Sequence, residues 1–199
     1  MANDLSLTPF KALAGVDVFW GKWGSPGWRK LDPAFLAELE LTLAELWEEC
    51  PWGEPDAILS GGAYIPREIK PGDRHAAAQA FDLSGLDWSS GSGPRLRVSR
   101  RAKEDLPELM LGIECILRRG CPQVLGPWYN AAHEDHWHID SRAAARGWQP
   151  KSRSDVTFAR ACLHHIHGVE PGRVDAEIEV MGAEWDEWLL ATAREAFAR

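Results

Sequence analysis

"HEDHWHID", residues 133–140, places three of the chain's seven histidines and three carboxylates within eight positions. Packing a hydrophobic core does not require so many ionisable side chains in one short run. If the end of this stretch forms a strand, His136 and His138 point to the same face, because side chains on a strand repeat every two residues. The stretch therefore predicts one wall of a chemical site.

A second group of candidate metal ligands lies in "HAAAQAFD", residues 75–82. A tetrahedral catalytic zinc has three protein ligands and keeps one position for water, so at least one ligand must come from elsewhere in the chain. His75 ends a loop and Asp82 lies in the strand that follows, so a short reversal brings both to one ion. With His138 they form a two-histidine, one-aspartate set, which suits zinc. The same set describes the facial triad of non-haem iron oxygenases, which stays as an alternative.

The pattern of hydrophobic and turn-forming residues predicts an α+β domain with a small antiparallel sheet and flanking helices. Residues 33–50 carry leucines at helical spacing, with Asp32 as the N-cap and Pro33 at the first helical position. A second helix is predicted at 103–119. The predicted strands are 56–64, 80–85, 121–129 and 135–141.

The chain divides into two predicted parts. Residues 1–148 contain all the candidate ligands and form the predicted zinc domain, and residues 149–199 form a C-terminal helical extension with helices at 155–167 and 183–198. The run "HHIH", residues 164–167, adds three histidines without an obvious carboxylate or cysteine partner. We interpret them as solvated or locally paired side chains, with a second metal site as the alternative.

Composition and charge limit the partners. The 199-residue chain has a formal net charge of −8 and a pI near 5.4, which argues against nonspecific binding to nucleic acid or to anionic membranes. Four cysteines without CxxC spacing predict free thiols. No apolar run approaches the roughly 20 residues that span a bilayer. The N-terminal residues lack the pattern of a secretory signal peptide. We therefore expect synthesis in the cytoplasm and no membrane insertion; the oligomeric state stays open.

Three stretches together resemble a known family: "ILSGGAY" (58–64), "RHAAAQAFDLS" (74–84) and "GPWYNAAHEDHWHID" (126–140). They are similar to the zinc peptidases grouped as lysostaphin-type, D-Ala-D-Ala carboxypeptidase-type and hedgehog-type proteins. Within that group the chain looks most like the D-Ala-D-Ala carboxypeptidase branch, which includes phage L-alanyl-D-glutamate endopeptidases. The resemblance implies a hedgehog/D,D-peptidase-like fold in which His75, Asp82 and His138 bind Zn²⁺.

The resemblance also implies that Asp135, three residues before the last ligand, is the catalytic base. Glu134 is a competing base, because a neighbouring turn residue can point inward instead. Asp135 faces the metal only if a turn or bulge interrupts strand alternation there, since strict alternation would point it away.

Other residues are candidates for substrate contacts. His136 is predicted to hydrogen-bond a developing oxyanion, or otherwise to orient a ligand. His133 is expected to bind substrate or to support the base, and Tyr129 to line the cleft or to pack. Arg67, the nearest arginine to the position where the family has one, is the candidate for gripping a peptide carboxylate, with a solvated loop charge as the alternative.

The expected function is hydrolysis of a stem-peptide bond of peptidoglycan next to a D-amino acid. Such an enzyme would be a phage-type lytic peptidase (endolysin) that reaches the cell wall through a holin or as part of a virion. A different alternative is a zinc-stabilised binding or structural module of the same fold without turnover.

Overall fold

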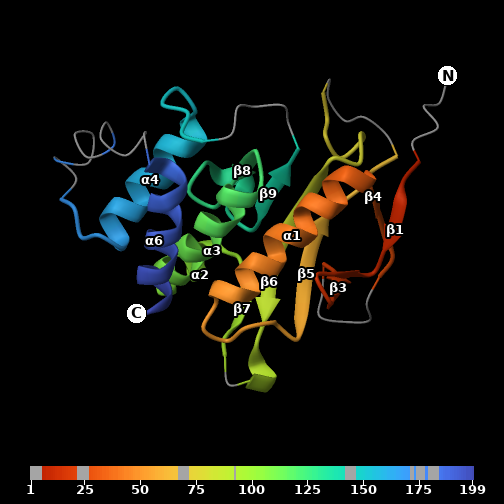
Figure 1. The fold of residues 1–199 in the computed structure, drawn as a ribbon, viewed down its shortest axis with the longest axis horizontal. Helices are drawn as coiled ribbons and strands as arrows, with labels where there is room; N and C mark the ends of the chain where they lie inside the picture. Colours follow the sequence, from red (N-terminus) through yellow and green to blue (C-terminus); the bar gives the residue numbers. More distant parts are fainter. Residues whose placement is uncertain are drawn as a thin grey trace.

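The computed structural model describes residues 6–21, 27–66, 72–91, 93–141, 147–170, 173, 178 and 184–199. It confirms the α+β class, because helices cover a central mixed sheet (Figure 1). The strands are β1 (Thr8–Phe10), β2 (Ala12–Leu13), β3 (Val16–Trp20), β4 (Arg29–Leu31), β5 (Ala57–Gly62), β6 (Ala80–Asp87), β7 (Arg95–Arg97), β8 (Gln123–Leu125) and β9 (Trp137–Asp140). The helices are α1 (Pro33–Glu49), α2 (Arg100–Asp105), α3 (Pro107–Gly120), α4 (Arg153–His165) and α6 (Trp185–Phe197), with short 3₁₀ turns η1 (Ser89–Gly91) and η2 (Ala131–His133).

Strand β6 is the centre of the sheet. The described strands follow the order β2-β3-β5-β6-β9-β8, while β1 and β4 form a separate pair. The first half of β6 pairs with β9 and the second half pairs with β7, whereas β5 pairs along its other edge. Every strand that carries a candidate ligand therefore touches β6 or is β6 itself.

The sheet differs from the prediction in one respect. We expected a small antiparallel sheet, but β3 pairs with β5 in parallel, and the described sheet has seven strands. A parallel pair needs a crossover connection, and α1 supplies it between β3 and β5. Figure 1 shows α1 lying across the face of the sheet formed by β5 and β6.

Helix α1 confirms the predicted start of the first helix. The Asp32 carboxylate accepts hydrogen bonds from the backbone N–H groups of Ala34 and Phe35 at 3.1 and 3.0 Å, and Pro33 occupies the first turn. This cap satisfies two of the donors that a helix N-terminus leaves without intrahelical partners.

The predicted helix at 103–119 is two helices. Leu106 leaves the helical region with φ −137° and ψ 47°, so α2 ends and α3 begins at Pro107. Proline has no backbone N–H and disfavours helical geometry in the residue before it. The prediction of a single helix was wrong, because Pro107 separates α2 from α3.

The C-terminal helices share one hydrophobic core with the rest of the chain. Phe158 of α4 and Leu189 of α6 belong to the same buried cluster as Ile113 and Ile116 of α3. Figure 1 shows α4 and α6 beside α3, on the side of the molecule opposite β1 and β3. The division of the chain at residue 148 stays a prediction.

Two other predictions concern thiols and membranes. All four cysteines are free and buried, as expected: Cys50, Cys115, Cys121 and Cys162. Among the described residues, each helix is too short or too polar to cross a bilayer.

Candidate metal centre

The three candidate ligands meet on adjacent strands. Asp82 of β6 stands directly opposite His138 of β9 in the antiparallel register, and His75 lies in the loop that leads into β6. Asp82 Oδ1 lies 2.9 Å from His138 Nδ1, and Asp82 Oδ2 lies 3.3 Å from His75 Nε2. One possible ligand atom from each residue lies within 4.8 Å of the others. The Asp82 carboxylate therefore sits between two imidazoles, close enough for all three to share an ion.

Gly62 makes room for this arrangement. It is the register partner of Asp82 on β5, where the pairing is irregular. A Cβ atom at Gly62 would lie 2.5 Å from Asp82 Oδ2 and 3.3 Å from His75 Cε1. A glycine inside a strand often marks such a close approach. The pair of glycines at 61–62 was the signal that would have identified this residue as part of the site.

The backbone fixes the orientation of His75. Its Nδ1 lies 2.6 Å from the carbonyl oxygen of Ala63, and a carbonyl can only accept, so Nδ1 carries the proton. The lone pair of the neutral ring is then on Nε2, the atom that faces Asp82. This tautomer is the one that a metal ligand needs.

His138 contacts a carboxylate on each side. Its Nδ1 faces Asp82, and its Nε2 lies 3.3 Å from Oδ2 of Asp140, which is fully buried. A carboxylate on the second nitrogen of a metal-binding histidine orients the ring and raises its basicity. The contact with His138 gives Asp140 the position of such a supporting carboxylate.

The charges in the cluster shift its pKa values. Burial lowers the pKa of His138, but hydrogen bonds to Asp140 and Asp82 outweigh burial and raise it to about 9. Burial lowers the pKa of His75 too, yet the interactions with Asp82 leave it above its ordinary value. Burial raises the pKa of Asp82, but the two histidines outweigh it and hold the pKa well below its usual range. Asp82 is thus an anion between two imidazoles whose pKa values are raised, and a divalent cation would take the place of the proton on His138.

We expect zinc affinity to rise with pH between 6.5 and about 9. The ordinary pKa of His138 is 6.5 and the folded value is about 9, so at neutral pH zinc must displace a proton from this ring. Each pH unit below 9 then costs about tenfold in affinity for one released proton. The stability of the metal-free protein is expected to change in the opposite direction. The raised pKa of His138 stabilises the fold fully below pH 6.5, and this contribution is lost as pH rises towards 9. Calorimetric zinc titrations in buffers of different ionisation enthalpy measure the released protons; zero release at pH 7 would contradict this expectation.

The residues of "HEDHWHID" surround the cluster. His136, just before β9, has Nε2 at 3.7 Å from Asp82 Oδ1, so it shares the face of His138 as the alternation predicted. Its other nitrogen, Nδ1, lies 2.7 Å from Asp135 Oδ1. Asp135 follows η2 in a turn, so the break in strand alternation that its proposed role requires is present. Its side chain is 74% exposed and reaches the cluster through His136. Glu134 is exposed in the same turn.

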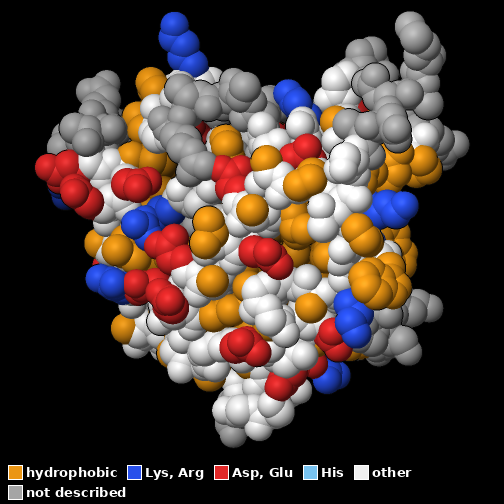
Figure 2. All heavy atoms as spheres, turned by 45° about the vertical axis from the view of Figure 1, so that its right-hand side comes forward, with side chains coloured by type: hydrophobic (Ala, Val, Ile, Leu, Met, Phe, Trp, Pro, Cys, Tyr) orange, Lys and Arg blue, Asp and Glu red, His pale blue; other side chains and the backbone are white. Residues whose placement is uncertain are grey.

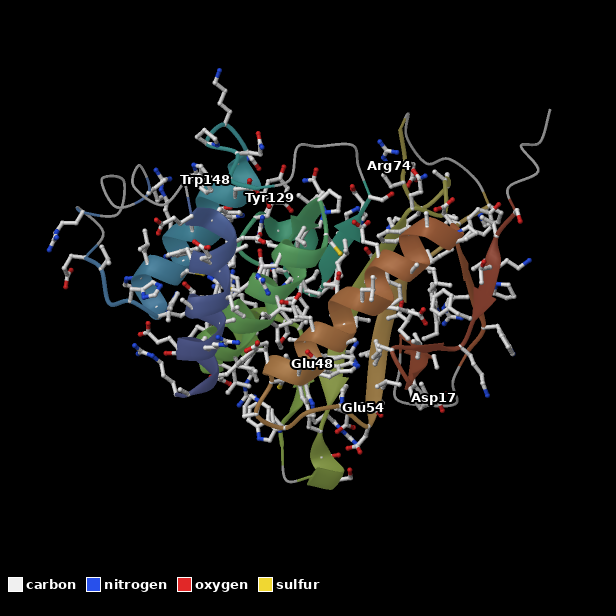
Figure 3. The ribbon with its side chains drawn as sticks, in the orientation of Figure 1. Asp17, Glu48, Glu54, Arg74, Tyr129 and Trp148 are labelled. Atoms are coloured by element: carbon white, nitrogen blue, oxygen red, sulfur yellow. The ribbon has the colours of Figure 1, made fainter. Side chains whose placement is uncertain are left out.

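His133 lies beside His136, Tyr129 lies beside His133, and the three residues form the rim of the cluster. The His133 ring centroid lies 5.3 Å from that of His136, 6.0 Å from that of His138 and 5.5 Å from that of Tyr129. Tyr129 also contacts the guanidinium of Arg153, with 5.7 Å between the carbon and the ring centroid. Figure 3 shows Tyr129 and Arg74, the neighbour of His75, at one end of the sheet, with Glu48, Glu54 and Asp17 towards the other. The predicted substrate residue Arg67 lies outside the described residues.

The histidines of "HHIH" are locally paired. His167 Nδ1 lies 3.1 Å from Glu195 Oε2, and its Nε2 lies 3.1 Å from Thr192 Oγ1. His165 contacts the ring of Trp128. Within the described part of the chain, the group of His75, Asp82 and His138 is the one whose geometry suits a metal ion.

Comparison with known proteins gives one match. The family model described as extensin-like protein C-terminus matches residues 57–150, a little less than half of the chain. This segment runs from β5 through β9 and contains all three candidate ligands. No curated protein matches the chain. No solved structure matches it either.

Proposed function

We propose that this chain is a zinc-dependent peptidase with a hedgehog/D,D-peptidase-like fold that hydrolyses a stem-peptide bond of peptidoglycan. The observation that carries the proposal is the cluster of two imidazoles and one carboxylate whose ligand atoms lie within 4.8 Å of one another. The donor set fits zinc, since the Ala63 carbonyl holds the proton of His75 on Nδ1 and leaves Nε2 as the ligand atom, and Asp82 is ionised. The three ligands leave a fourth position for water or substrate.

A zinc ion held by His75, Asp82 and His138 would supply Lewis acidity and acidify a water towards a pKa of about 7. The residues of the chain would then transfer the protons. Asp135 is the proposed acceptor of the water's proton and its later donor to the leaving amine. His136 links Asp135 to the cluster, so it can hydrogen-bond the oxygen on which charge develops.

His133 and Tyr129 stay the proposed substrate contacts. The His133 ring lies beside His136, and the Tyr129 ring lies beside His133, so both extend from the proposed proton-transfer pair. Arg67 stays the proposed partner for a peptide carboxylate. As the substrate is bacterial wall, the proposed place of action is the cell wall, reached through a holin or in a virion.

Replacement of Asp135 by alanine is expected to remove turnover and leave zinc in place. General acid–base catalysis contributes about 10²–10⁴-fold to a rate, so the variant should lose a factor in this range. Glu134→Ala is the matched control, since it removes a neighbouring exposed carboxylate from the same turn. Purified peptidoglycan is digested with each protein, and mass spectrometry of the muropeptides identifies the new termini and therefore the bond.

Two outcomes would change the proposal. Loss of activity in Glu134→Ala with activity kept in Asp135→Ala would make Glu134 the base. Zinc-loaded wild-type protein that leaves several wall chemotypes intact would favour a binding or structural module instead.

A further inference from the structure

A separate pocket of about 720 Å³ opens on the side of the molecule formed by β1, β3 and β4. Its walls include Trp20, Trp28, Arg29, Lys30 and Tyr64. The volume falls within the roughly 300–1,000 Å³ of ligand-binding pockets. Figure 2 brings this side forward and shows hydrophobic side chains beside Lys and Arg side chains on it.

The pocket presents two tryptophans to solvent. Trp28 is 67% exposed and Trp20 is 51% exposed, whereas Trp47, Trp88 and Trp137 are buried in the core. Leaving such large apolar surfaces in water is unfavourable unless a partner covers them. A flat indole face packs well on the C–H face of a sugar ring, because both surfaces are rigid and apolar.

The pocket is also positively charged in an acidic protein. The chain has a net charge of −8, yet none of the described residues that line the pocket is acidic. The Arg29 guanidinium lies 4.1 Å from the centroid of the Trp20 ring, and its Nη1 donates to the Trp28 carbonyl oxygen at 2.7 Å. The ring and the carbonyl thus fix the guanidinium in place.

Arg29 retains unused donors. Its Nε and Nη2 atoms are buried and have no hydrogen-bond partner among the described residues. Both atoms are closed to solvent, so a ligand in the pocket meets the positive charge of Arg29 and makes no direct hydrogen bond to this pair of atoms. Lys30 is exposed nearby and adds a second positive charge.

The pocket lies next to the metal centre along the same strands. Trp20 is the register partner of Ser60 on β5, and the N–H of Gly21 donates to the Ser60 carbonyl at 2.9 Å. Two residues further along, Gly62 abuts Asp82. Tyr64, in the pocket wall, follows Ala63, whose carbonyl orients His75. A ligand bound in the pocket therefore sits beside the chain segment that shapes the metal centre.

We propose that this pocket binds a saccharide that carries a carboxylate. The exposed indoles provide apolar platforms for a pyranose ring, and Arg29 with Lys30 provides the counter-charge for its acid. Two sources have this chemistry: the muramic acid of a glycan strand without its peptides, and a polysaccharide of uronic acids. The inference goes beyond the proposed hydrolysis, because it concerns binding at residues outside the metal centre.

Isothermal calorimetry on the full chain tests the inference with three probes of matched length. They are peptide-free glycan strands with free lactyl carboxylates, oligogalacturonate, and neutral chitin oligosaccharide. We expect at least one acidic probe to bind about tenfold or more tightly than the neutral one, which corresponds to about 1.4 kcal/mol. The acidic probe that binds better identifies the source.

Variants locate the binding. Trp28→Ala removes an exposed platform and leaves the carbonyl that holds Arg29, and Lys30→Gln removes one charge. Each variant is expected to bind the acidic probe about tenfold more weakly than wild type. Lys30→Gln should also make this affinity less dependent on salt concentration. Trp52→Ala is the matched control, since Trp52 is 38% exposed, packs on Trp88 and does not line the pocket.

Three results would overturn the inference: no saccharide binding, equal binding of neutral and acidic probes, or equal effects of Trp28→Ala and Trp52→Ala. Each titration is run on zinc-loaded and on chelator-treated protein. Saccharide binding without peptidoglycan hydrolysis would contradict the proposed function and support this inference. Hydrolysis without saccharide binding would contradict this inference and support the proposed function.

Discussion

Asp82→Asn is expected to lower zinc affinity by more than 100-fold and to abolish hydrolysis. The Asp82 carboxylate contacts both imidazoles, through Oδ2 to His75 and Oδ1 to His138, so its charge is central to the cluster. An amide keeps the shape of the side chain but supplies only a weak neutral oxygen ligand. Loss of a supporting residue outside the ligand set typically costs about 10–100-fold in metal affinity, and loss of a ligand should cost more.

Asp140→Asn is the matched control for this experiment. Asp140 contacts His138 through the opposite ring nitrogen and is fully buried, so it orients a ligand from behind. We expect Asp140→Asn to lower zinc affinity by roughly 10–100-fold, the usual effect of losing such a supporting residue. Zinc titration against a competing chelator gives both affinities. Thermal unfolding with and without chelator gives a second readout, since zinc at about 100 times its Kd adds about 2.7 kcal/mol of stability. Equal affinities for wild type and Asp82→Asn would remove Asp82 from the ligand set.

Local patterns in the sequence predicted much of the candidate metal centre. Alternation along a strand placed His136 and His138 on one face, and the structure confirms this, with both rings near Asp82. The register that sets Asp82 opposite His138 is a long-range pairing, and no local pattern encodes it. The sequence analysis combined His75, Asp82 and His138 as one ligand set, and the resemblance to a family implied the same set, but neither gave the register. The turn that frees Asp135 from strand alternation also depends on η2, which the sequence pattern did not predict.

The N-terminal strands were missed although one carried a signal. In β3, Val16 and Val18 are buried while Asp17 between them is exposed, which is the alternation of a half-buried strand. The stretch is short, and its partner β5 is reached only after the whole of α1. The pocket was missed for a related reason. Trp20 and Trp28 come together only because β3 and β4 bring them to one side of the molecule.

The sequence also did not predict a buried ion pair on α3. Glu114 and Arg118 are four residues apart, which on most helices describes a solvated surface pair of little energetic value. Here their side chains are only 1% and 5% exposed. Arg118 donates to Glu114 Oε1 and to Asp155 Oδ1, both at 2.8 Å from its terminal nitrogens, and also to the Val124 carbonyl. It therefore joins α3 to α4 and β8.

The pair also contacts the strand that carries the candidate ligand His138. Trp137, the residue before His138, donates its indole N–H to Glu114 Oε2 at 3.2 Å. Gly126 allows the close approach, since a Cβ atom there would overlap the Glu114 carboxylate. Burial raises the pKa of Glu114, and Arg118 opposes that rise without cancelling it. The carboxyl depends on this guanidinium for its charge.

Arg118→Met should therefore destabilise the fold by about 3–5 kcal/mol, the usual cost of leaving a buried charge without its partner. Without Arg118 the folded pKa of Glu114 rises further. A raised carboxyl pKa gives stability that is present below its ordinary value of 4.5 and lost as pH increases. The loss should thus be larger at pH 7 than at pH 4.5. Urea unfolding at both pH values measures it.

The cause of the loss can be separated from the loss of packing around Arg118. In the Arg118→Met background, Glu114→Gln removes the stranded charge and keeps an oxygen for the Trp137 indole, so the double variant should be more stable than the single one at pH 7. Arg101→Met is the surface control, because Arg101 is 89% exposed and its pair with Asp105 lies in solvent; it should unfold like wild type. If Glu114→Gln brings no recovery, the stranded carboxylate is not the source of the instability, and Arg118 acts through its contacts with α4 and β8 instead.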